Sequence, residues 1–247
     1  MQHKIRLRSN LSKEMGPKDK MSRLIPHIKY TYLLISLLLL FLIFPLFEGL
    51  VVARIILTIF FSTVLISAIF VVSQKRELLT IGIILSVPAL IGNWSVYFVE
   101  SYSLELMGRS FSILFLAFTT TNITATVFRE EKVTADTIAG AICVYLLIGL
   151  TWAYLYSVTE LIRPGSFTLE PSMTRTPSLY AHQKFGLFFY YSFVTLTTLG
   201  YGDIIPLTPP ARSLSMLEAV MGPVYLTVLV AKLVALQISH SGKDRPG

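Results

Sequence analysis

Long apolar stretches separated by short polar connections dominate the chain. A helix needs about 20 mostly apolar residues to cross the roughly 30 Å of hydrocarbon in a bilayer. Stretches of this kind occupy residues 28–47, 55–73, 78–99, 110–128, 134–160 and 211–239. The pattern therefore predicts an all-α membrane protein with six transmembrane helices.

The region between the fifth and sixth predicted spans has a different pattern. Residues 161–184 are rich in proline and charged residues, which predicts a polar loop outside the membrane. Residues 185–198 are apolar and aromatic but too short to span, and glycine-rich backbone follows them. Non-helical backbone at membrane depth must be buried in protein or line an aqueous path. We therefore expect a re-entrant helix here.

The glycine-rich stretch has the chemistry of a cation site. A potassium ion gives up its water only to a cage of suitably spaced oxygens, and backbone carbonyls can supply this cage. The backbone must then alternate between right- and left-handed conformations, and Gly200 and Gly202 can adopt the left-handed ones because they lack a Cβ. We expect K+ to bind the carbonyls of Thr198, Leu199, Gly200 and Tyr201, together with the Thr198 hydroxyl.

A longer string around this stretch carries a family resemblance. Residues 190–206, YYSFVTLTTLGYGDIIP, resemble the pore helix, selectivity filter and exit loop of tetrameric potassium channels, especially small prokaryotic ones with one pore segment. A Gly-Tyr-Gly triplet alone is an ordinary turn, but the whole string between two spans favours a filter. The resemblance implies a homotetramer, since one segment supplies one wall of the cage. Leu199 replaces the usual valine or isoleucine, and its side chain is expected to face the pore helix and leave selectivity intact.

The resemblance also implies a set of residues that support the filter. Some family members carry a glutamate at the position of Val194, paired with the aspartate that is Asp203 here. Since Val194 offers no such partner, we expect the Tyr190 hydroxyl to bond Asp203; alternatively, Asp203 is a solvated charge at the mouth. The Tyr201 side chain is expected to point away from the ion, where, together with Tyr190 and Tyr191, it braces the filter against collapse. The supporting residues are Tyr190, Tyr191, Val194, Thr197 and Asp203.

Two further features concern opening. The fourth predicted span carries Arg109 and Arg129 only at its ends, so it lacks the internal charges that make opening steeply voltage-dependent. The last span contains Gly222-Pro223, where proline removes a backbone hydrogen bond. We predict a gating hinge at this pair, with a static kink as the alternative. In either case, substitutions there are expected to leave selectivity unchanged.

Composition agrees with a membrane protein. Hydrophobic residues make up 53% of the chain and charged ones 14%, with a mean hydropathy of +0.66; soluble domains average about 25% charged residues. The single cysteine, Cys143, cannot form a disulfide within the chain. Most of the net charge of +7 lies in residues 1–30. Beside a membrane span, this indicates the cytoplasmic side and contact with anionic lipids rather than nucleic acid.

Charge also predicts the orientation and the domains. Basic residues in the N-terminal segment and in the connections near residues 75 and 130 fall on one side, which is therefore cytoplasmic. Both termini are then cytoplasmic, in a multi-pass protein of the plasma or inner membrane. The expected parts are a basic segment, a four-helix region without sensor arginines, a pore domain and a short cytoplasmic tail, at residues 1–27, 28–128, 134–240 and 241–247.

Two other classes of function remain as alternatives. One is a transporter subunit, or a less selective cation channel, that uses a filter-like loop. Against a transporter, the chain has one such loop, and Lys232 is the one charged residue expected at depth in the last span. The other class is an enzyme, which we do not expect because no catalytic set, metal cluster or phosphate loop stands out. No cofactor is expected, and K+ is the permeant ion.

Overall fold

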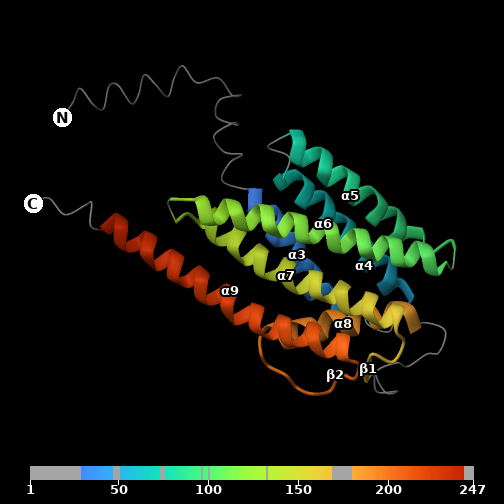
Figure 1. The fold of residues 1–247 in the computed structure, drawn as a ribbon. Coiled ribbons are helices and arrows are strands. Elements are labelled where there is room, and N and C mark those ends of the chain that lie inside the picture. The colour runs from blue at the N-terminus through green and yellow to red at the C-terminus, as the bar shows by residue number, and fades with distance from the viewer. Residues whose placement is uncertain are drawn as a thin grey trace, which may run out of the picture.

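The computed structural model describes residues 29–46, 51–72, 76–95, 97–99, 101–131, 133–168 and 180–241. The expected basic segment at 1–27, most of the tail at 241–247 and part of the polar loop lie outside the described residues. The all-α prediction is confirmed, with one short strand pair added (Figure 1). The elements are α3 (Lys29–Leu46), α4 (Val51–Val72), α5 (Arg76–Ser95), α6 (Tyr102–Arg129), α7 (Ala135–Ile162), β1 (Phe167–Thr168), α8 (Tyr180–Leu196), β2 (Ile205–Pro206) and α9 (Pro209–Ser241).

Four helices of the described part are long and apolar enough to cross a membrane. They are α5, α6, α7 and residues Pro209–Ile238 of α9. The described part of α3 contributes a shorter apolar helix, Tyr30–Leu42, and α8 contributes another, Phe185–Leu196. The protein is thus an all-helical integral membrane protein, while the count of six spans stays a prediction.

Several helix boundaries differ from the prediction. The predicted fourth span starts at residue 110, but α6 starts at Tyr102, directly after Ser101 in extended conformation (φ −127°, ψ 118°). The hydropathy pattern does not predict the first turns of α6, residues 102–109, because Glu105 and Arg109 are charged. They form an ion pair one helical turn apart, which satisfies both charges inside the helix. The predicted re-entrant helix at 185–198 is α8 at Tyr180–Leu196.

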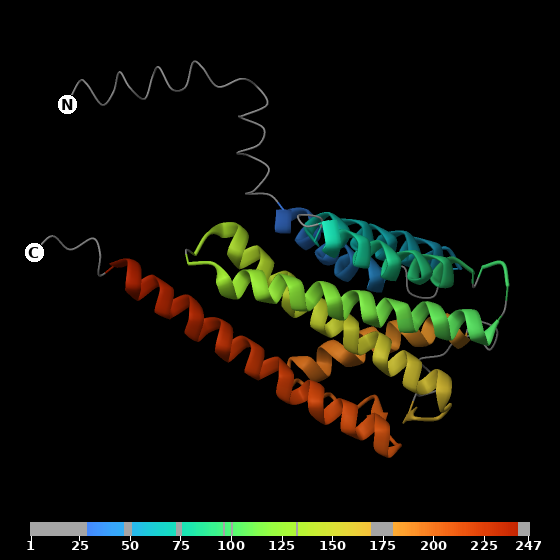
Figure 2. The same ribbon diagram turned by 45° about the horizontal axis from the view of Figure 1, so that its top comes forward.

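Neighbouring helices in the first part of the chain pack closely. A Cβ added at Gly92 of α5 would lie 2.2 Å from the Cα of Gly108 in α6, so only glycine permits this backbone approach. A short connection through residues 130–134 then places α6 and α7 side by side and antiparallel (Figures 1 and 2). Thr134 caps α7 by accepting a hydrogen bond from the backbone N–H of Thr137.

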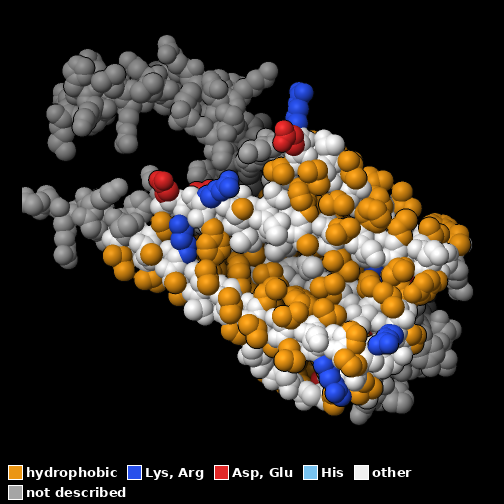
Figure 3. Space-filling view, in the orientation of Figure 1, with side chains coloured by type: hydrophobic (Ala, Val, Ile, Leu, Met, Phe, Trp, Pro, Cys, Tyr) orange, Lys and Arg blue, Asp and Glu red, His pale blue; other side chains and the backbone are white. Residues whose placement is uncertain are grey.

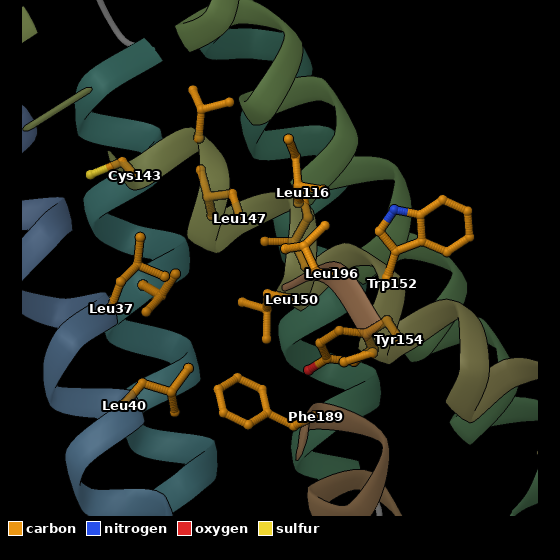
Figure 4. Packing of buried hydrophobic residues seen from close by; sticks show 14 of the residues in the cluster. Leu37, Leu40, Leu116, Cys143, Leu147, Leu150, Trp152, Tyr154, Phe189 and Leu196 are labelled. Carbon is orange, nitrogen blue, oxygen red and sulfur yellow. The ribbon is translucent and has the colours of Figure 1, made fainter. Parts of the chain in front are cut away.

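The core surrounds α7 and α8. Buried side chains from α3, α6, α7 and α8 converge there, among them Leu37, Leu116, Leu150 and Phe189 (Figure 4). A Cβ at Gly149 of α7 would meet the ring of Phe193, so α8 lies tightly against α7. The short helix α8 is therefore held inside the protein rather than lying on its surface.

The helix α9 lies along one edge of the bundle and packs against α7 and α8 (Figures 1 and 2). Many of its apolar side chains stay exposed, including those of Met216, Val220 and Val224. The space-filling view shows apolar side chains over the middle of this face and charged ones toward its two ends (Figure 3). This banding is typical of a protein whose middle lies in hydrocarbon.

Candidate functional site

The backbone after α8 turns back onto the last carbonyls of that helix. The N–H of Leu199 donates to the carbonyl of Val194 at 2.9 Å, and the N–H of Gly200 reaches the same oxygen at 3.2 Å. The N–H of Thr198 donates to the Thr195 carbonyl at 2.9 Å. These bonds satisfy the orphan acceptors that every helix leaves at its C-terminus. They also fix the start of the predicted filter to the end of α8.

The segment then alternates in backbone conformation. Thr198, Gly200 and Gly202 have positive φ, at 60°, 59° and 78°, whereas Leu199 and Tyr201 do not. The left-handed conformations expected at Gly200 and Gly202 are present, and Thr198 adds one that the sequence does not predict. A β-branched residue at positive φ is strained. Nothing lies within 4 Å of a Cβ added at either glycine, so backbone conformation, and not crowding, requires glycine there.

The carbonyls of this segment are available to a ligand. Within the described part of the chain, the carbonyl groups of residues 198–202 accept no hydrogen bond. All five residues are exposed in the single subunit. Their N–H and C=O groups are thus used differently: the first N–H groups are bound to α8, and the carbonyl oxygens are left for a cation or for water.

Asp203 has the partner that the sequence predicts. The Tyr190 hydroxyl donates to its Oδ2 at 2.7 Å, and Oδ1 accepts from the backbone N–H of Ile204 at 3.0 Å. Asp203 is therefore tied to α8 and is not simply a solvated charge.

Other residues of the predicted filter and its support contact α9, the β1 segment and the end of α8. The Tyr191 hydroxyl pairs with Ser215 of α9 at 2.7 Å, and its ring contacts Phe167. Leu199 is 55% exposed in the single subunit. Thr197 donates its hydroxyl to the Phe193 carbonyl at 2.6 Å, which adds to the end of α8.

The loop after the segment is fixed to the loop after α7. Strands β1 and β2 pair antiparallel, with Phe167 opposite Pro206. The N–H of Leu207 donates to the carbonyl of Ser166 at 2.8 Å. The carboxylate of Glu160 in turn accepts from the N–H of Ser166 at 2.9 Å. The exit of the segment is therefore anchored to α7, as its entrance is anchored to α8.

Comparison with known proteins decides what this arrangement is. Residues 165–237, from the end of the α7 loop through most of α9, match the family model described as ion channel. This segment is an ion-channel pore domain. Searches of curated proteins and of solved structures find no match to the chain. The helices α8 and α9 are called by the roles predicted for them, pore helix and inner helix, and residues 198–202 are called the predicted filter.

The predicted hinge of the pore domain has a packing role. The inner helix is continuous through Gly222 and Pro223. A Cβ added at Gly222 would lie 2.0 Å from the carbonyl oxygen of Leu196, the last residue of the pore helix. Glycine is thus required for this close approach of α9 to the end of α8. Bending at this pair stays a prediction.

One residue of the pore domain is missing from the sequence-based set. Glu218, in the inner helix, is fully buried and lies between the pore helix and α7. The expectation that Lys232 is the one charged residue at depth in this span is therefore wrong. The signal was in the sequence, because an acidic residue inside an apolar span marks a functional site by default.

Proposed function

We propose that this chain is the subunit of a potassium-selective channel that conducts K+ passively as a homotetramer. The observation that carries the proposal is the alternation of positive φ at Thr198, Gly200 and Gly202, directly after a buried short helix. The match of the surrounding segment to the ion-channel family supports it. The free carbonyls of residues 198–202 supply the oxygens that such a cage requires.

The proposed mechanism uses the backbone for selection and the pore helix for attraction. Carbonyl oxygens of Thr198, Leu199, Gly200 and Tyr201, with the Thr198 hydroxyl, replace the hydration shell of K+ in successive layers. The C-terminal end of α8 carries roughly −0.5 elementary charge, which favours any cation in the cavity below. Selection of K+ over Na+ is then left to the spacing of the carbonyl layers, which the bonds at both ends of the filter maintain.

Assembly around the filter accounts for the exposed apolar surface of the pore domain. Leu199 and Tyr201 are 55% and 66% exposed in the single subunit, and Met216, Val220 and Val224 of α9 are also exposed. One subunit provides one wall of a cage, so four copies are needed to surround the ion. In that assembly, neighbouring subunits cover these side chains, and lipid covers the outer helices.

The proposed channel is not steeply voltage-gated. Arg109 of α6 is buried, pairs with Glu105, and donates to the Ser157 carbonyl of α7 at 3.1 Å. This arginine is thus attached to the outer helix of the pore rather than free to move through the field. We place both termini in the cytoplasm and the filter mouth outside, with the basic N-terminal residues against anionic lipids.

The alternatives are a transporter subunit and a less selective cation channel. Glu218 is the observation that favours a transporter, because transporters place ionisable groups at membrane depth. Its side chain is fully buried among the hydroxyls of its own subunit, so it does not line a path for ions.

Flux into vesicles tests the proposal. The purified full-length chain is reconstituted into liposomes, and uptake of K+, Rb+ and Na+ is compared with that of protein-free liposomes. We expect uptake of K+ and Rb+ but not of Na+. This uptake should follow the imposed electrochemical gradient, as a passive channel requires. Equal uptake of Na+ would favour the less selective channel, and uptake coupled to another ion would favour the transporter. Native mass spectrometry of the same sample is expected to give four copies.

A further inference from the structure

Glu218 is a buried carboxyl group at the junction of three helices. It lies in α9, has no exposed surface, and contacts side chains of both α7 and α8. At a rise of about 1.5 Å per residue it lies roughly 14 Å along the inner helix from Pro209. An ionised carboxyl at such a place is very costly unless a cation or several donors compensate it.

Hydroxyl groups surround this carboxyl. The Tyr156 hydroxyl of α7 donates to Oε2, and the Ser192 hydroxyl of α8 lies 2.5 Å from Oε1. The same Ser192 hydroxyl lies 2.7 Å from the carbonyl oxygen of Gly149 in α7. Ser192 thus sits between a carboxyl oxygen and a carbonyl oxygen, at hydrogen-bond distance from both.

Because the Ser192 hydroxyl has a single hydrogen, its two contacts constrain whether the Glu218 carboxyl group is protonated. A serine hydroxyl has one hydrogen to donate and two lone pairs with which to accept. For both contacts to be hydrogen bonds, Ser192 must donate its one hydrogen to the Gly149 carbonyl, which can only accept. The contact between Ser192 and Oε1 is then a hydrogen bond only if Oε1 carries a proton and donates. Oε2 is left as the carbonyl oxygen of a neutral acid, which matches its role as acceptor from Tyr156.

The other groups near Glu218 agree with a neutral acid. The titratable side chains that interact electrostatically with Glu218 are Tyr145 and Tyr156 from α7 and Tyr191 from α8. None of them is a cation. In the described part of the chain, no lysine, arginine or histidine contacts Glu218. A carboxylate here has nothing of opposite charge to balance it.

We propose that Glu218 is a positioning residue of the pore, held as a neutral carboxylic acid that donates to Ser192 and joins the inner helix to the pore helix. The proposal rests on the proposed function for its effect on conduction. Ser192 lies about half a turn before Val194, whose carbonyl accepts from the N–H groups of Leu199 and Gly200 in the filter. Ionisation of Glu218 places an uncompensated charge at this junction and displaces the pore helix, so conduction falls as pH becomes alkaline.

Infrared spectroscopy tests the protonation state without any need for conduction. A protonated carboxyl group has a C=O stretching band that a carboxylate and an amide lack. We expect the full-length protein at neutral pH to show this band and to lose it at alkaline pH, and we expect Glu218→Gln to lack it. Glu77→Gln, which removes an exposed carboxyl group in α5, is the control and should keep the band. Absence of the band from the parent would overturn the proposal.

Conduction tests the positioning role. Glutamine retains an acceptor for Tyr156 and a donor for Ser192, so Glu218→Gln should keep parental K+ flux and selectivity and lose the alkaline decline. Glu218→Leu loses both bonds, and its K+ flux should fall about tenfold. If the glutamine variant resembles the leucine variant, or declines at alkaline pH as the parent does, the proposal is wrong. A parent without selective K+ flux would instead contradict the proposed function, while the infrared band still decides the state of Glu218.

Discussion

The helices before residue 165 and the pore domain that follows use their backbones differently. Among the described residues, positive φ occurs only at Gly165, Thr198, Gly200 and Gly202, all within the matched segment 165–237. In α5 and α6, glycine instead permits close contact, as between Gly92 and Gly108. The first region is built by side-chain packing of regular helices, whereas the pore domain places unpaired carbonyls and strained backbone at one point. Conduction should therefore depend on backbone conformation in the second region and tolerate change in the first.

The largest effect is expected from Gly202→Ala. Its φ of 78° costs a residue with a Cβ about 1–2 kcal/mol in every subunit, and relaxation of that strain moves a carbonyl layer. We expect loss of K+ conduction or of its selectivity, with membrane insertion intact. Gly165→Ala is a matched control, because Gly165 has a similar φ of 82°, equally open surroundings and a position outside the filter. Unchanged ion permeability in Gly202→Ala would remove the filter assignment.

Gly222→Ala should have the next largest effect. The added methyl group meets the Leu196 carbonyl at the base of the filter, so it should alter selectivity and lower stability by about 1–3 kcal/mol. Pro223→Ala adds a backbone donor at an exposed position and meets no such contact. A hinge instead predicts that both variants change open probability and that neither changes selectivity. Single-channel recordings of the two variants separate the hinge from the packing role.

Arg109→Gln probes the first region. Removing the arginine leaves Glu105 largely buried without its partner, which should cost about 3 kcal/mol of stability. The conductance–voltage relation should remain shallow in both the parent and the variant, because neither has charges that cross the field. Thermal unfolding in detergent measures the first effect, and recordings across a range of voltages measure the second. A steep relation in the parent that flattens in Arg109→Gln would show that α6 is a voltage sensor.

The smallest effect is expected from Tyr190→Phe. This change removes one hydroxyl donor from Asp203, which keeps its bond to the N–H of Ile204. A single hydrogen bond contributes about 1 kcal/mol, so filter stability should fall slightly. Selectivity is expected to persist, with a modestly faster loss of current during sustained opening. A loss as severe as that of Gly202→Ala would mean that Asp203 and not the backbone maintains the filter.

Much of the pore domain was predictable because its requirements are visible in residue types. Gly200 and Gly202 indicated left-handed backbone. Because Val194 is not a carboxylate, the sequence also predicted the hydrogen bond between Tyr190 and Asp203. The positive φ of Thr198 was not predictable, since β-branched residues give no sign of it. The start of α6 was hidden because Glu105 and Arg109 neutralise each other only once the helix places them one turn apart.

The contacts between helices were the least predictable part. Gly222 beside Pro223 suggested flexibility, but its contact with Leu196 depends on how α8 and α9 pack, which no local pattern encodes. Glu218 is visible in the sequence as an acid in an apolar span. Its partners Tyr156 and Ser192 lie far from it in the sequence, so only the fold brings the three together.

The reversal potential of a single reconstituted channel tests the central claim most directly. The parent protein is placed in a planar bilayer with K+ on one side and Na+ on the other. If the carbonyls of residues 198–202 select K+, the current should reverse far from zero, at a potential that opposes K+ efflux. Reversal near zero, or a shift toward Na+, would contradict the account.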